Sequence, residues 1–190
     1  MSSDMNALAD EQLVEAYRAG DETSLRTLFE RYVGPVYNFI CRYVGSDGDA
    51  EDITQDVFVS VWKNIKRFDR NRKFKTWIFA IAKNASLNWI KKKKPILFSA
   101  FENAQGENVL ADTLSDPAPL PDELLADVDL ARKLSWAVAQ LNPNWRAVLS
   151  LRYDNQLTFQ EISEALSEPL DTVKSRHRRA LLHLKELLSG

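Results

Sequence analysis

Apolar residues recur at three- and four-residue intervals through the first half of the chain, which is the spacing of amphipathic α-helices. One stripe contains Leu13 and Tyr17 and continues through Leu28 and Tyr32, with a break predicted at Gly20-Asp21. A second pattern covers residues 36–44, and Gly34-Pro35 before it indicates a kink or a helix boundary. The N-terminal part, residues 10–94, is therefore expected to be helical throughout.

A third stripe begins at Asp49, after a turn predicted at residues 45–48. Its apolar positions are Ile53, Val57, Phe58, Val61, Trp62 and Ile65. Residues 68–74 show no period and several bases, which favours a loop, and residues 76–90 again predict a helix. In that helix Trp77, Ile78, Ile81, Ala82 and Ala85 are expected to pack inward.

The C-terminal part, residues 126–190, carries a sharper pattern. Residues 130–141 predict an amphipathic helix ending before Asn142-Pro143, and residues 145–153 predict another. Thr158 and Glu161 stand at the spacing of a capping box, in which a hydroxyl and a carboxylate satisfy the free amides at a helix start. With a turn over residues 167–170 and a helix over residues 171–188, the pattern predicts a helix-turn-helix.

The last helix has two distinct faces. Val173, Ala180, Leu181, Leu184 and Leu188 are expected to face the core, and a 100° step per residue places a polar and basic set on the outer arc. That outer set is Thr172, Lys174, Ser175, Arg178 and Arg179. The N-terminal half of such a helix is the part that enters a major groove. An amphipathic basic helix is also often only a solvated surface, and His177 and His183 are expected to pack rather than to bind a ligand.

Residues 95–125 lack sustained periodicity and contain four prolines. From residue 99 to residue 130 there are eight acids and no base. We interpret this stretch as a linker between two helical domains. Its thirty-one residues reach about 100 Å when stretched and about 30 Å as a relaxed coil, so the domains could lie far apart on one DNA molecule.

Composition narrows the function classes. The chain has 190 residues, of which 45% are hydrophobic and 27% charged, as in ordinary globular proteins. It contains no apolar run long enough for a membrane span and no secretory signal, and one cysteine, Cys41, excludes an internal disulfide. We expect a cytoplasmic protein with no metal site, no cofactor and no catalytic motif of its own.

Charge is segregated along the chain. Between residues 63 and 94 there are twelve Lys or Arg residues and a single acid, Asp69, although the net charge of the protein is −2. Phe68, Phe74, Trp77, Phe79 and Trp89 are interleaved with these bases. Cations neutralise phosphates and flat rings stack on exposed bases, so the segment is typical of single-strand binding. For Trp77 and Phe79, core packing is the better interpretation.

Two polar faces remain open to more than one interpretation. Asn84, Asn88 and Lys91 fall on one ridge of the helix over residues 76–90, where amides could contact base edges or could form only a solvated face. In the third stripe the early acids suit the positive end of a helix dipole. Asp52, Gln55 and Asp56 lie off its apolar face and could equally bind a basic partner.

Nearly the whole chain resembles a known family, the extracytoplasmic-function (ECF, group 4) RNA polymerase sigma factors of the sigma-70 family. The N-terminal resemblance rests on DAEDITQDVF at residues 49–58 and FKTWI at residues 74–78, together with Gly20-Asp21, Trp62 and Phe68. The C-terminal resemblance rests on LNP at 141–143, FQEI at 159–162 and PLDTVKSR at 169–176. Both halves in this order, separated by an acidic linker, make it specific.

The resemblance implies a promoter-specificity subunit with an all-α, two-domain fold and no catalysis. Residues 1–94 would form sigma region 2 and residues 126–190 sigma region 4. The implied partners are core RNA polymerase, through its clamp coiled coil and flap, promoter DNA, and an anti-sigma factor that controls the protein. No membrane insertion is expected.

The resemblance also implies residue roles. The clamp-binding residues would be Asp52, Gln55, Asp56 and Phe58. The minus-ten element would be opened and held by Arg70, Asn71, Arg72, Lys73, Phe74, Lys75, Trp77, Asn84, Asn88, Lys91 and Lys92. The minus-thirty-five duplex would be read by Thr172, Lys174, Ser175, Arg178 and Arg179.

Some positions depart from the family pattern. Ser167, Asp171 and Gln156 stand where the family often has glycine; Asp171 could act as an N-cap, whereas Ser167 implies left-handed strain or an altered turn. The loop at residues 70–73 is more basic than expected and lacks a usual glycine, which leaves its base preference open.

Three other functions are compatible with parts of the sequence. A one-component helix-turn-helix regulator would bind duplex DNA without polymerase, but it leaves the acidic third stripe unexplained. A sigma mimic that only sequesters an anti-sigma protein would need neither basic face. A membrane-surface protein using residues 91–94 would need an anchor that the sequence does not show.

Overall fold

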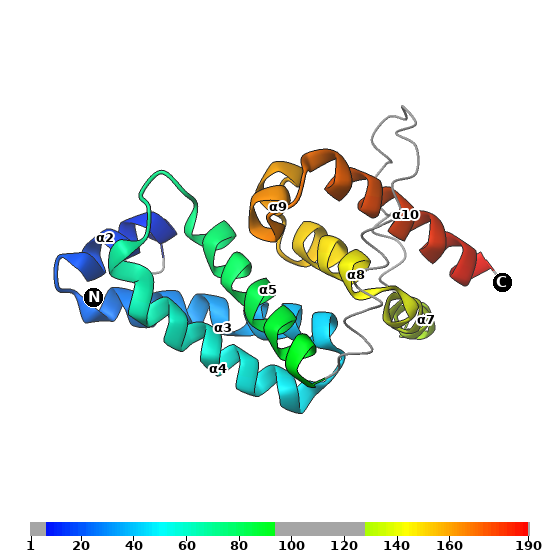
Figure 1. The fold of residues 1–190 in the computed structure, drawn as a ribbon, viewed down its shortest axis with the longest axis horizontal. Coiled ribbons are helices and arrows are strands. Elements are labelled where there is room, and N and C mark those ends of the chain that lie inside the picture. Colours follow the sequence, from blue (N-terminus) through cyan, green and yellow to red (C-terminus); the bar gives the residue numbers. More distant parts are fainter. Residues whose placement is uncertain (1–6, 94–127, 190) are drawn as a thin grey trace.

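The N-terminal helices of the computed structural model, which describes residues 7–93 and 128–189, follow the predicted stripes. Helix α2 (Asp10–Arg18) leads into α3 (Glu22–Val44) and α4 (Asp47–Asn64), and a short 3-10 turn, η1 (Ile65–Arg67), precedes α5 (Phe74–Lys93). We call these elements the N-terminal unit. Figure 1 shows α3 and α4 lying side by side with α5 packed across them.

The helix ends have local causes. Asp21 begins α3, because its carboxylate accepts a hydrogen bond from the Thr23 N–H at 3.0 Å. Gly45 ends it with a left-handed φ of 72°, a conformation that glycine adopts without steric cost. The N-terminus of α5 is capped from a distance, since the Phe74 N–H donates to Glu11 Oε1 at 2.9 Å.

Gly34-Pro35 was predicted to be a kink or a helix boundary, and the boundary is wrong. Helix α3 is 23 residues long and continues through Pro35. An interior proline costs about 3 kcal/mol, but Tyr32, Val36 and Phe39 on the same helix are buried, while Pro35 is exposed. Burial of that face outweighs the lost hydrogen bond.

The C-terminal unit consists of α7 (Val128–Gln140), α8 (Pro143–Leu149), the π-helical turn η3 (Ser150–Asp154), α9 (Phe159–Leu166) and α10 (Leu170–Ser189). The helix expected over residues 145–153 thus begins earlier, because the Asn142 side chain accepts the Trp145 N–H at 2.9 Å and Pro143 suits the first helical position. It ends in the π-helical turn, where the Asn155 N–H donates to the Ser150 carbonyl five residues back.

The helix-turn-helix is present in α9 and α10. Thr158 and Glu161 form the predicted capping box, with the Thr158 N–H donating to Glu161 Oε2 at 2.8 Å. Of the two alternatives open for Ser167, the structure has the left-handed conformation, with φ 55°, and Gln156 has the same φ. The predicted N-cap role of Asp171 is wrong, because α10 begins at Leu170 and places Asp171 inside the first turn.

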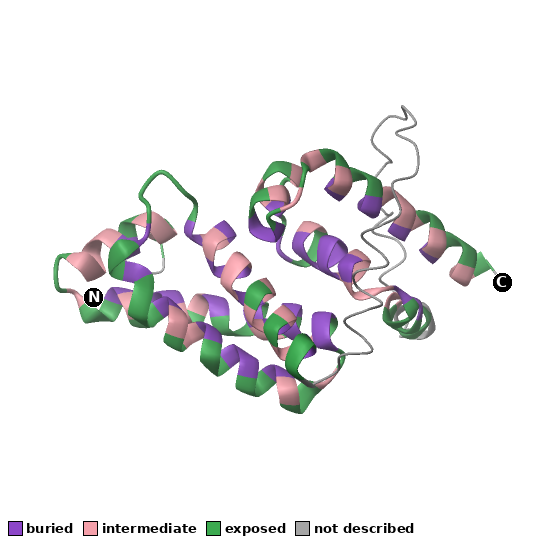
Figure 2. Ribbon diagram, viewed as in Figure 1, coloured by how far each residue is buried: buried purple, intermediate pink, exposed green. Residues whose placement is uncertain are grey.

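The two units pack against each other. Helix α9 lies along α5, and α8 with η3 lies against α3. Val148, Leu151, Ile162 and Leu166 belong to the same buried cluster as Phe79, and Figure 2 shows buried bands on the facing sides of both units. The all-α fold with two small helical domains is confirmed, whereas the predicted linker, residues 95–125, lies outside the described residues.

Leu151→Ala is expected to lower the free energy of unfolding by about 2–4 kcal/mol, because Leu151 is fully buried in this cluster and truncation leaves a cavity. Leu182→Ala is the matched control: Leu182 is 52% exposed on α10, and we expect a change below about 0.5 kcal/mol. Urea unfolding followed by circular dichroism measures both. Equal stability of the two variants would contradict the packing of η3 in the core.

Candidate nucleic-acid interface

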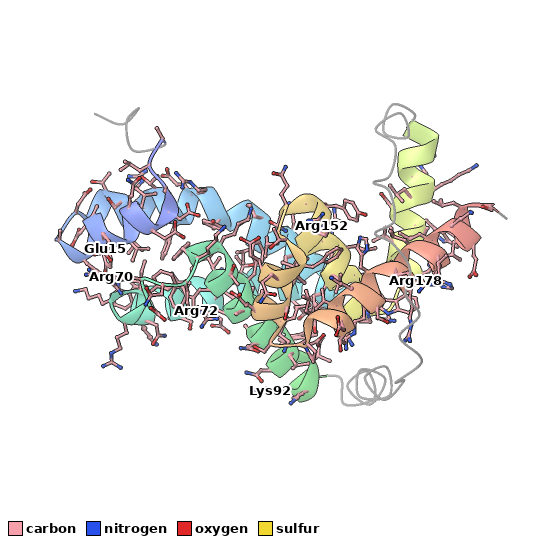
Figure 3. The ribbon with its side chains drawn as sticks, turned by 90° about the horizontal axis from the view of Figure 1, so that it is seen from above. Glu15, Arg70, Arg72, Lys92, Arg152 and Arg178 are labelled. Atoms are coloured by element: carbon pink, nitrogen blue, oxygen red, sulfur yellow. The ribbon has the colours of Figure 1, made fainter. Side chains whose placement is uncertain are left out.

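The loop between η1 and α5, residues 68–73, is held in place at both ends. Phe68 is 5% exposed, and its carbonyl accepts a hydrogen bond from the Arg18 guanidinium. Asp69 Oδ1 accepts the Asn71 N–H at 3.0 Å, which forms a tight polar turn. Arg70 Nη2 pairs with Glu15 Oε2 at 2.9 Å, and Figure 3 shows these two side chains together at one end of the molecule.

A surface hollow of about 340 Å³ opens beside this loop. Its lining combines aromatic, cationic and amide groups contributed by α4, η1, the loop and α5. The lining residues are Ser60, Asn64, Arg67, Phe68, Asp69, Arg72, Trp77 and Ile81. Such a cavity offers a ring face for stacking and polar groups for the edge of a base.

The sequence prediction contained Arg72 and Trp77 of this hollow but missed Ser60, Asn64, Arg67 and Ile81. Ser60 and Asn64 lie one helical turn apart on α4, and the Asn64 amide donates to the Ser60 carbonyl at 2.8 Å. Their spacing is visible in the sequence, but no nearby residue in the sequence indicates that α4 would line the same hollow as Trp77.

Phe74 is the one predicted minus-ten residue whose side chain the structure removes from the interface. Its ring is fully buried and packs edge-on against Tyr32 at 5.3 Å and against Phe68 at 5.9 Å. No base can reach that ring, so the assignment of Phe74 is corrected. Trp77 is half-buried, with its ring 5.0 Å from Phe68, and it both packs and lines the hollow.

Helix α5 presents its polar ridge to solvent. Asn84, Asn88, Lys91 and Lys92 are all exposed, whereas Ile78, Phe79, Ala82 and Ile90 on the same helix are buried. Lys75, by contrast, is half-buried in the first turn. Figure 3 shows Arg72 at the loop end of α5 and Lys92 at the other end. The exposed ridge therefore occupies the C-terminal half of α5, residues 84–92, whereas residues 74–83 are buried or half-buried.

Lys73 is bound by the other unit. Its Nζ lies 2.9 Å from Glu161 Oε1 on α9. This hydrogen bond and the charge of Glu161 raise the pKa of Lys73. Burial opposes ionisation of Glu161, but hydrogen bonds from Lys73 and Thr158 and the lysine charge outweigh it and lower the pKa of Glu161 to about 2.

The outer arc of α10 is only partly exposed to solvent. Lys174 and Ser175 are exposed, and Thr172, Arg178 and Arg179 are half-exposed. Arg176, in the same helix, is 7% exposed and pairs with Glu168 in the turn before α10. Arg176 therefore stabilises the helix-turn-helix from within, while the neighbouring residues face outward. Both histidines pack as expected: His177 is 4% exposed and 3.1 Å from the Tyr153 hydroxyl, and His183 is half-exposed.

The acidic residues of α4 precede its hollow-lining residues Ser60 and Asn64 along the same helix. Asp52, Gln55 and Asp56 are exposed, and Phe58 is half-buried, with its ring 4.7 Å from Phe29. Val59 and Trp62, 48% and 57% exposed, continue the same side of the helix. Sequence analysis counted Trp62 as core, but the structure leaves it in solvent, so the acidic face gains an apolar extension.

Other chemistry is sparse in the described ranges 7–93 and 128–189. There, no three His, Cys, Asp or Glu side chains are grouped to hold a metal ion. No helix in the same ranges has the length and apolarity needed to cross a membrane. Cys41 is half-buried, and burial raises the pKa of its thiol.

The fold and these surfaces define a two-unit helical protein with a basic and aromatic surface on one unit and a helix-turn-helix on the other. Family models match both: Sigma-70 region 2 over residues 28–96 and Sigma-70 region 4 over residues 137–186. The chain is 31% identical over 177 residues to the ECF RNA polymerase sigma factor SigW of Bacillus subtilis, covering 92% of this chain and 94% of that one. It belongs to the ECF RNA polymerase sigma factors.

Further similarities agree. The ECF RNA polymerase sigma-E factor of Escherichia coli K12 is 28% identical over 175 residues, covering 91% of each chain. Among solved structures, CnrH in complex with the cytosolic domain of CnrY matches with a TM-score of 0.65, at 21% identity, over 96% of this chain and 98% of that one. RpoE in complex with the anti-sigma factor NepR from Bartonella quintana matches with a TM-score of 0.60, at 20% identity, over 86% and 96%. These two structures support the fold.

Glu161→Gln is expected to lower the free energy of unfolding at pH 7 by about 1 kcal/mol. The effect is small because Lys73 is 71% exposed and solvent screens the ion pair. A Gln side chain can still accept the N–H in the capping box, so the lost stability reports the lost charge of Glu161. Because the folded pKa of Glu161 lies below its ordinary value of 4.5, the stabilisation is present above about pH 4.5 and disappears as pH falls towards 2. Urea unfolding of both proteins between pH 3 and pH 7 should show the difference shrinking with acid; a constant difference would contradict the pairing.

Proposed function

We propose that this chain is an alternative sigma factor that binds core RNA polymerase, directs it to specific promoters and opens their minus-ten region. Residues 1–94 form the domain that docks on polymerase and opens DNA, residues 95–125 the linker, and residues 126–190 the domain that reads the upstream duplex. The observation that carries the proposal is the joint match to Sigma-70 regions 2 and 4 on one chain.

The hollow beside residues 68–73 is the place for a flipped minus-ten base. The half-buried Trp77 supplies the ring face, with the buried Phe68 behind it, and Asn64, Arg67 and Arg72 supply polar contacts. Extruding a base costs a few kcal/mol, and each base stacked on an aromatic ring returns about 1–3 kcal/mol. The strand is bordered by Arg70, Asn71, Lys73 and Lys75. Because stacking returns an energy similar to the cost of extrusion, melting proceeds without nucleotide hydrolysis by this chain.

The ridge on α5 holds the opened strand beyond that base. Asn84 and Asn88 carry both a donor and an acceptor for base edges, and Lys91 and Lys92 supply cations for phosphates. All four are exposed, and the buried face of α5 keeps the ridge rigid. The strand therefore runs from the hollow along one helix.

The upstream duplex is read by α10. Lys174 and Ser175 are exposed at its N-terminal half, with Thr172, Arg178 and Arg179 beside them. A helix-turn-helix presents this part of its second helix to the major groove. The buried pair of Arg176 and Glu168 braces the turn, so the reading residues stand on a fixed element.

Polymerase docks on α4 through Asp52, Gln55 and Asp56, with the half-buried Phe58 at the edge of this surface. Carboxylates suit the basic clamp coiled coil, and the exposed Val59 and Trp62 add apolar area next to them. The C-terminal unit contacts the flap. The net charge of −2 keeps the free protein weakly attracted to DNA, so DNA contact depends on docking.

The protein acts in the bacterial cytoplasm without a catalytic activity of its own, and an anti-sigma factor controls it. The support for such a partner is the similarity to RpoE, whose solved structure contains the anti-sigma factor NepR. An inhibitor of this kind would cover the polymerase-facing surfaces.

Reconstituted transcription tests the proposal. Purified chain and core polymerase are given a library of promoters with randomised upstream and minus-ten segments, and the transcripts are sequenced. We expect one pair of elements to be enriched. Duplex binding without polymerase, and no transcription, would instead identify a one-component regulator.

Lys174→Ala is expected to weaken holoenzyme binding to the upstream element while leaving core-polymerase binding unchanged. Loss of one phosphate contact should lower by about one the slope of the logarithm of the DNA-binding constant against the logarithm of the salt concentration. Lys185→Ala is the matched control, because Lys185 is also exposed on α10 but near its far end. Filter binding at several salt concentrations measures the effect, and identical curves for both variants would contradict the assignment of the reading face.

Asn84→Ala is expected to reduce promoter opening several-fold more than closed-complex formation, because its amide meets the strand only after the bases separate. Permanganate reactivity of opened thymines reports the first step and footprinting of the duplex reports the second. Asn38→Ala, which removes an exposed asparagine from α3, is the control. Wild-type reactivity in Asn84→Ala would count against the role of the ridge.

A further inference from the structure

A second surface hollow, of about 390 Å³, meets the hollow already described. Its walls come from α2 and from the loop before α5. The lining residues are Glu11, Gln12, Val14, Glu15, Phe68 and Arg70. Phe68 lines the first hollow as well, so the two hollows are neighbours that share one buried side chain. The function proposed above gives the first hollow an occupant and leaves the second one without.

The charges around the second hollow balance. Glu15 Oε1 lies 2.7 Å from Arg18 Nη1, and Glu15 Oε2 lies 2.9 Å from Arg70 Nη2. Figure 3 shows Glu15 and Arg70 together at one end of the molecule, with Arg72 further along. With Glu11, two acids therefore stand beside two bases. A phosphate would gain little net attraction here and would meet the Glu11 carboxylate, so the hollow suits an uncharged group.

The apolar part of the lining is buried. Val14 is 1% exposed and Phe68 is 5% exposed, and the Phe68 ring is fixed by the Trp77 ring at a centroid distance of 5.0 Å. An uncharged, flat group with polar edges fits a rigid apolar wall beside a few polar side chains, and a nucleobase is such a group. An unpaired strand that places one base in the first hollow brings its neighbouring bases to the second.

Two residues of α2 offer hydrogen bonds of opposite sense to such a base. Glu11 Oε1 accepts the Phe74 N–H at 2.9 Å, and within residues 7–93 and 128–189 the other oxygen, Oε2, makes no hydrogen bond. Gln12 Oε1 accepts the Ala9 N–H at 2.9 Å, which leaves the amide N–H groups of Gln12 as donors. The hollow thus presents one negatively charged acceptor next to one neutral donor.

A carboxylate acceptor distinguishes between bases. Adenine, cytosine and guanine carry an exocyclic amino group, and Glu and Asp accept hydrogen bonds from such groups. Thymine has no amino group, and its ring N–H lies between two carbonyl oxygens. Those oxygens would face the Glu11 carboxylate and be repelled by it, so thymine fits this hollow worst.

We infer that the second hollow binds a second unpaired base of the opened strand, with Glu11 as acceptor and Gln12 as donor, and that it selects against thymine. This inference rests on the proposed function, because it needs a strand that is already open. The shared Phe68 places the two bound bases on nearby nucleotides. Helix α2, which has no residue in the predicted binding sets, then contributes to the choice of promoter.

Binding of the holoenzyme to templates with a preformed bubble tests the inference. The bases of the bubble are unpaired from the start, so the measurement reports base reading and not promoter opening. The non-template strand is randomised through the minus-ten segment, and bound and unbound strands are sequenced. For the wild-type chain we expect about a tenfold discrimination against thymine at one position.

Glu11→Gln changes the sense of one hydrogen bond and little else. A Gln side chain keeps an oxygen for the Phe74 N–H and replaces the second oxygen with an amino group, which donates to the carbonyls of thymine. We expect the discrimination against thymine to disappear at that position alone. Asn64→Ala, in the first hollow, should change a different position. Glu22→Gln is the matched control, because Glu22 is an exposed acid of α3 that lines neither hollow.

Gln12→Glu gives a second measurement at an exposed position of α2. The oxygen that accepts the Ala9 N–H is kept, and the donor towards the base is lost. We expect weaker selection at the same position that Glu11→Gln changes. Thermal unfolding of each variant shows whether it is folded, so Gln12→Glu decides the question if Glu11→Gln does not fold.

Two outcomes would overturn the inference. The first is a wild-type chain that accepts thymine equally at every position of the bubble. The second is a set of folded α2 variants with the same base preferences as the wild type. If Asn64→Ala still changes its own position in either case, the proposed function stands and only the second site is lost. A wild-type holoenzyme that binds every bubble strand equally would contradict the proposed function as well.

Discussion

Helix α5 is buried from two directions, and its position determines where Trp77, Asn84 and Asn88 lie on the surface of the N-terminal unit. Phe79 and Ile78 anchor it in the core with α3, while α9 covers another side. The residues left over, Asn84 and Asn88, have only solvent to face. At the start of the helix, burial of Phe74 and the hydrogen bond from its N–H to Glu11 hold the preceding loop in place. Rigid aromatic packing of this kind holds the short basic loop in one conformation, so that the hollow beside it stays open.

Electrostatics then divides the molecule into surfaces with different partners. The bases gather at the loop and along α5, the acids on the outer side of α4 and on α9, and a second basic set on α10. Acids on α4 suit a basic protein partner, whereas bases near Trp77 suit a strand with unpaired bases. The acids of α9 have a different consequence, because Glu161 pairs with Lys73 within the same chain and so joins the basic loop to the C-terminal unit.

Apolar burial joins the two units of the chain. Val148, Leu151 and Ile162 of the C-terminal unit share one buried cluster with Ile78 and Phe79 of α5, and removing such surface from water favours the packed arrangement. The core that fixes α5 therefore also fixes the position of α8 and α9 against the N-terminal helices.

The sequence by itself determined most of the helices, the capping box of α9, the helix-turn-helix and the distribution of charge, because these depend on residues within about four positions of one another. The capping box at Thr158 and Glu161 is of this kind. Tertiary structure alone decided that α3 continues through Pro35, that Phe74 is core and that Asn64 and Trp77 line the same hollow. It also decided that Tyr43 meets Asn144, 101 residues away. Such contacts depend on which apolar stripes pair in space, and a periodic pattern specifies that a stripe will be buried without specifying its partner.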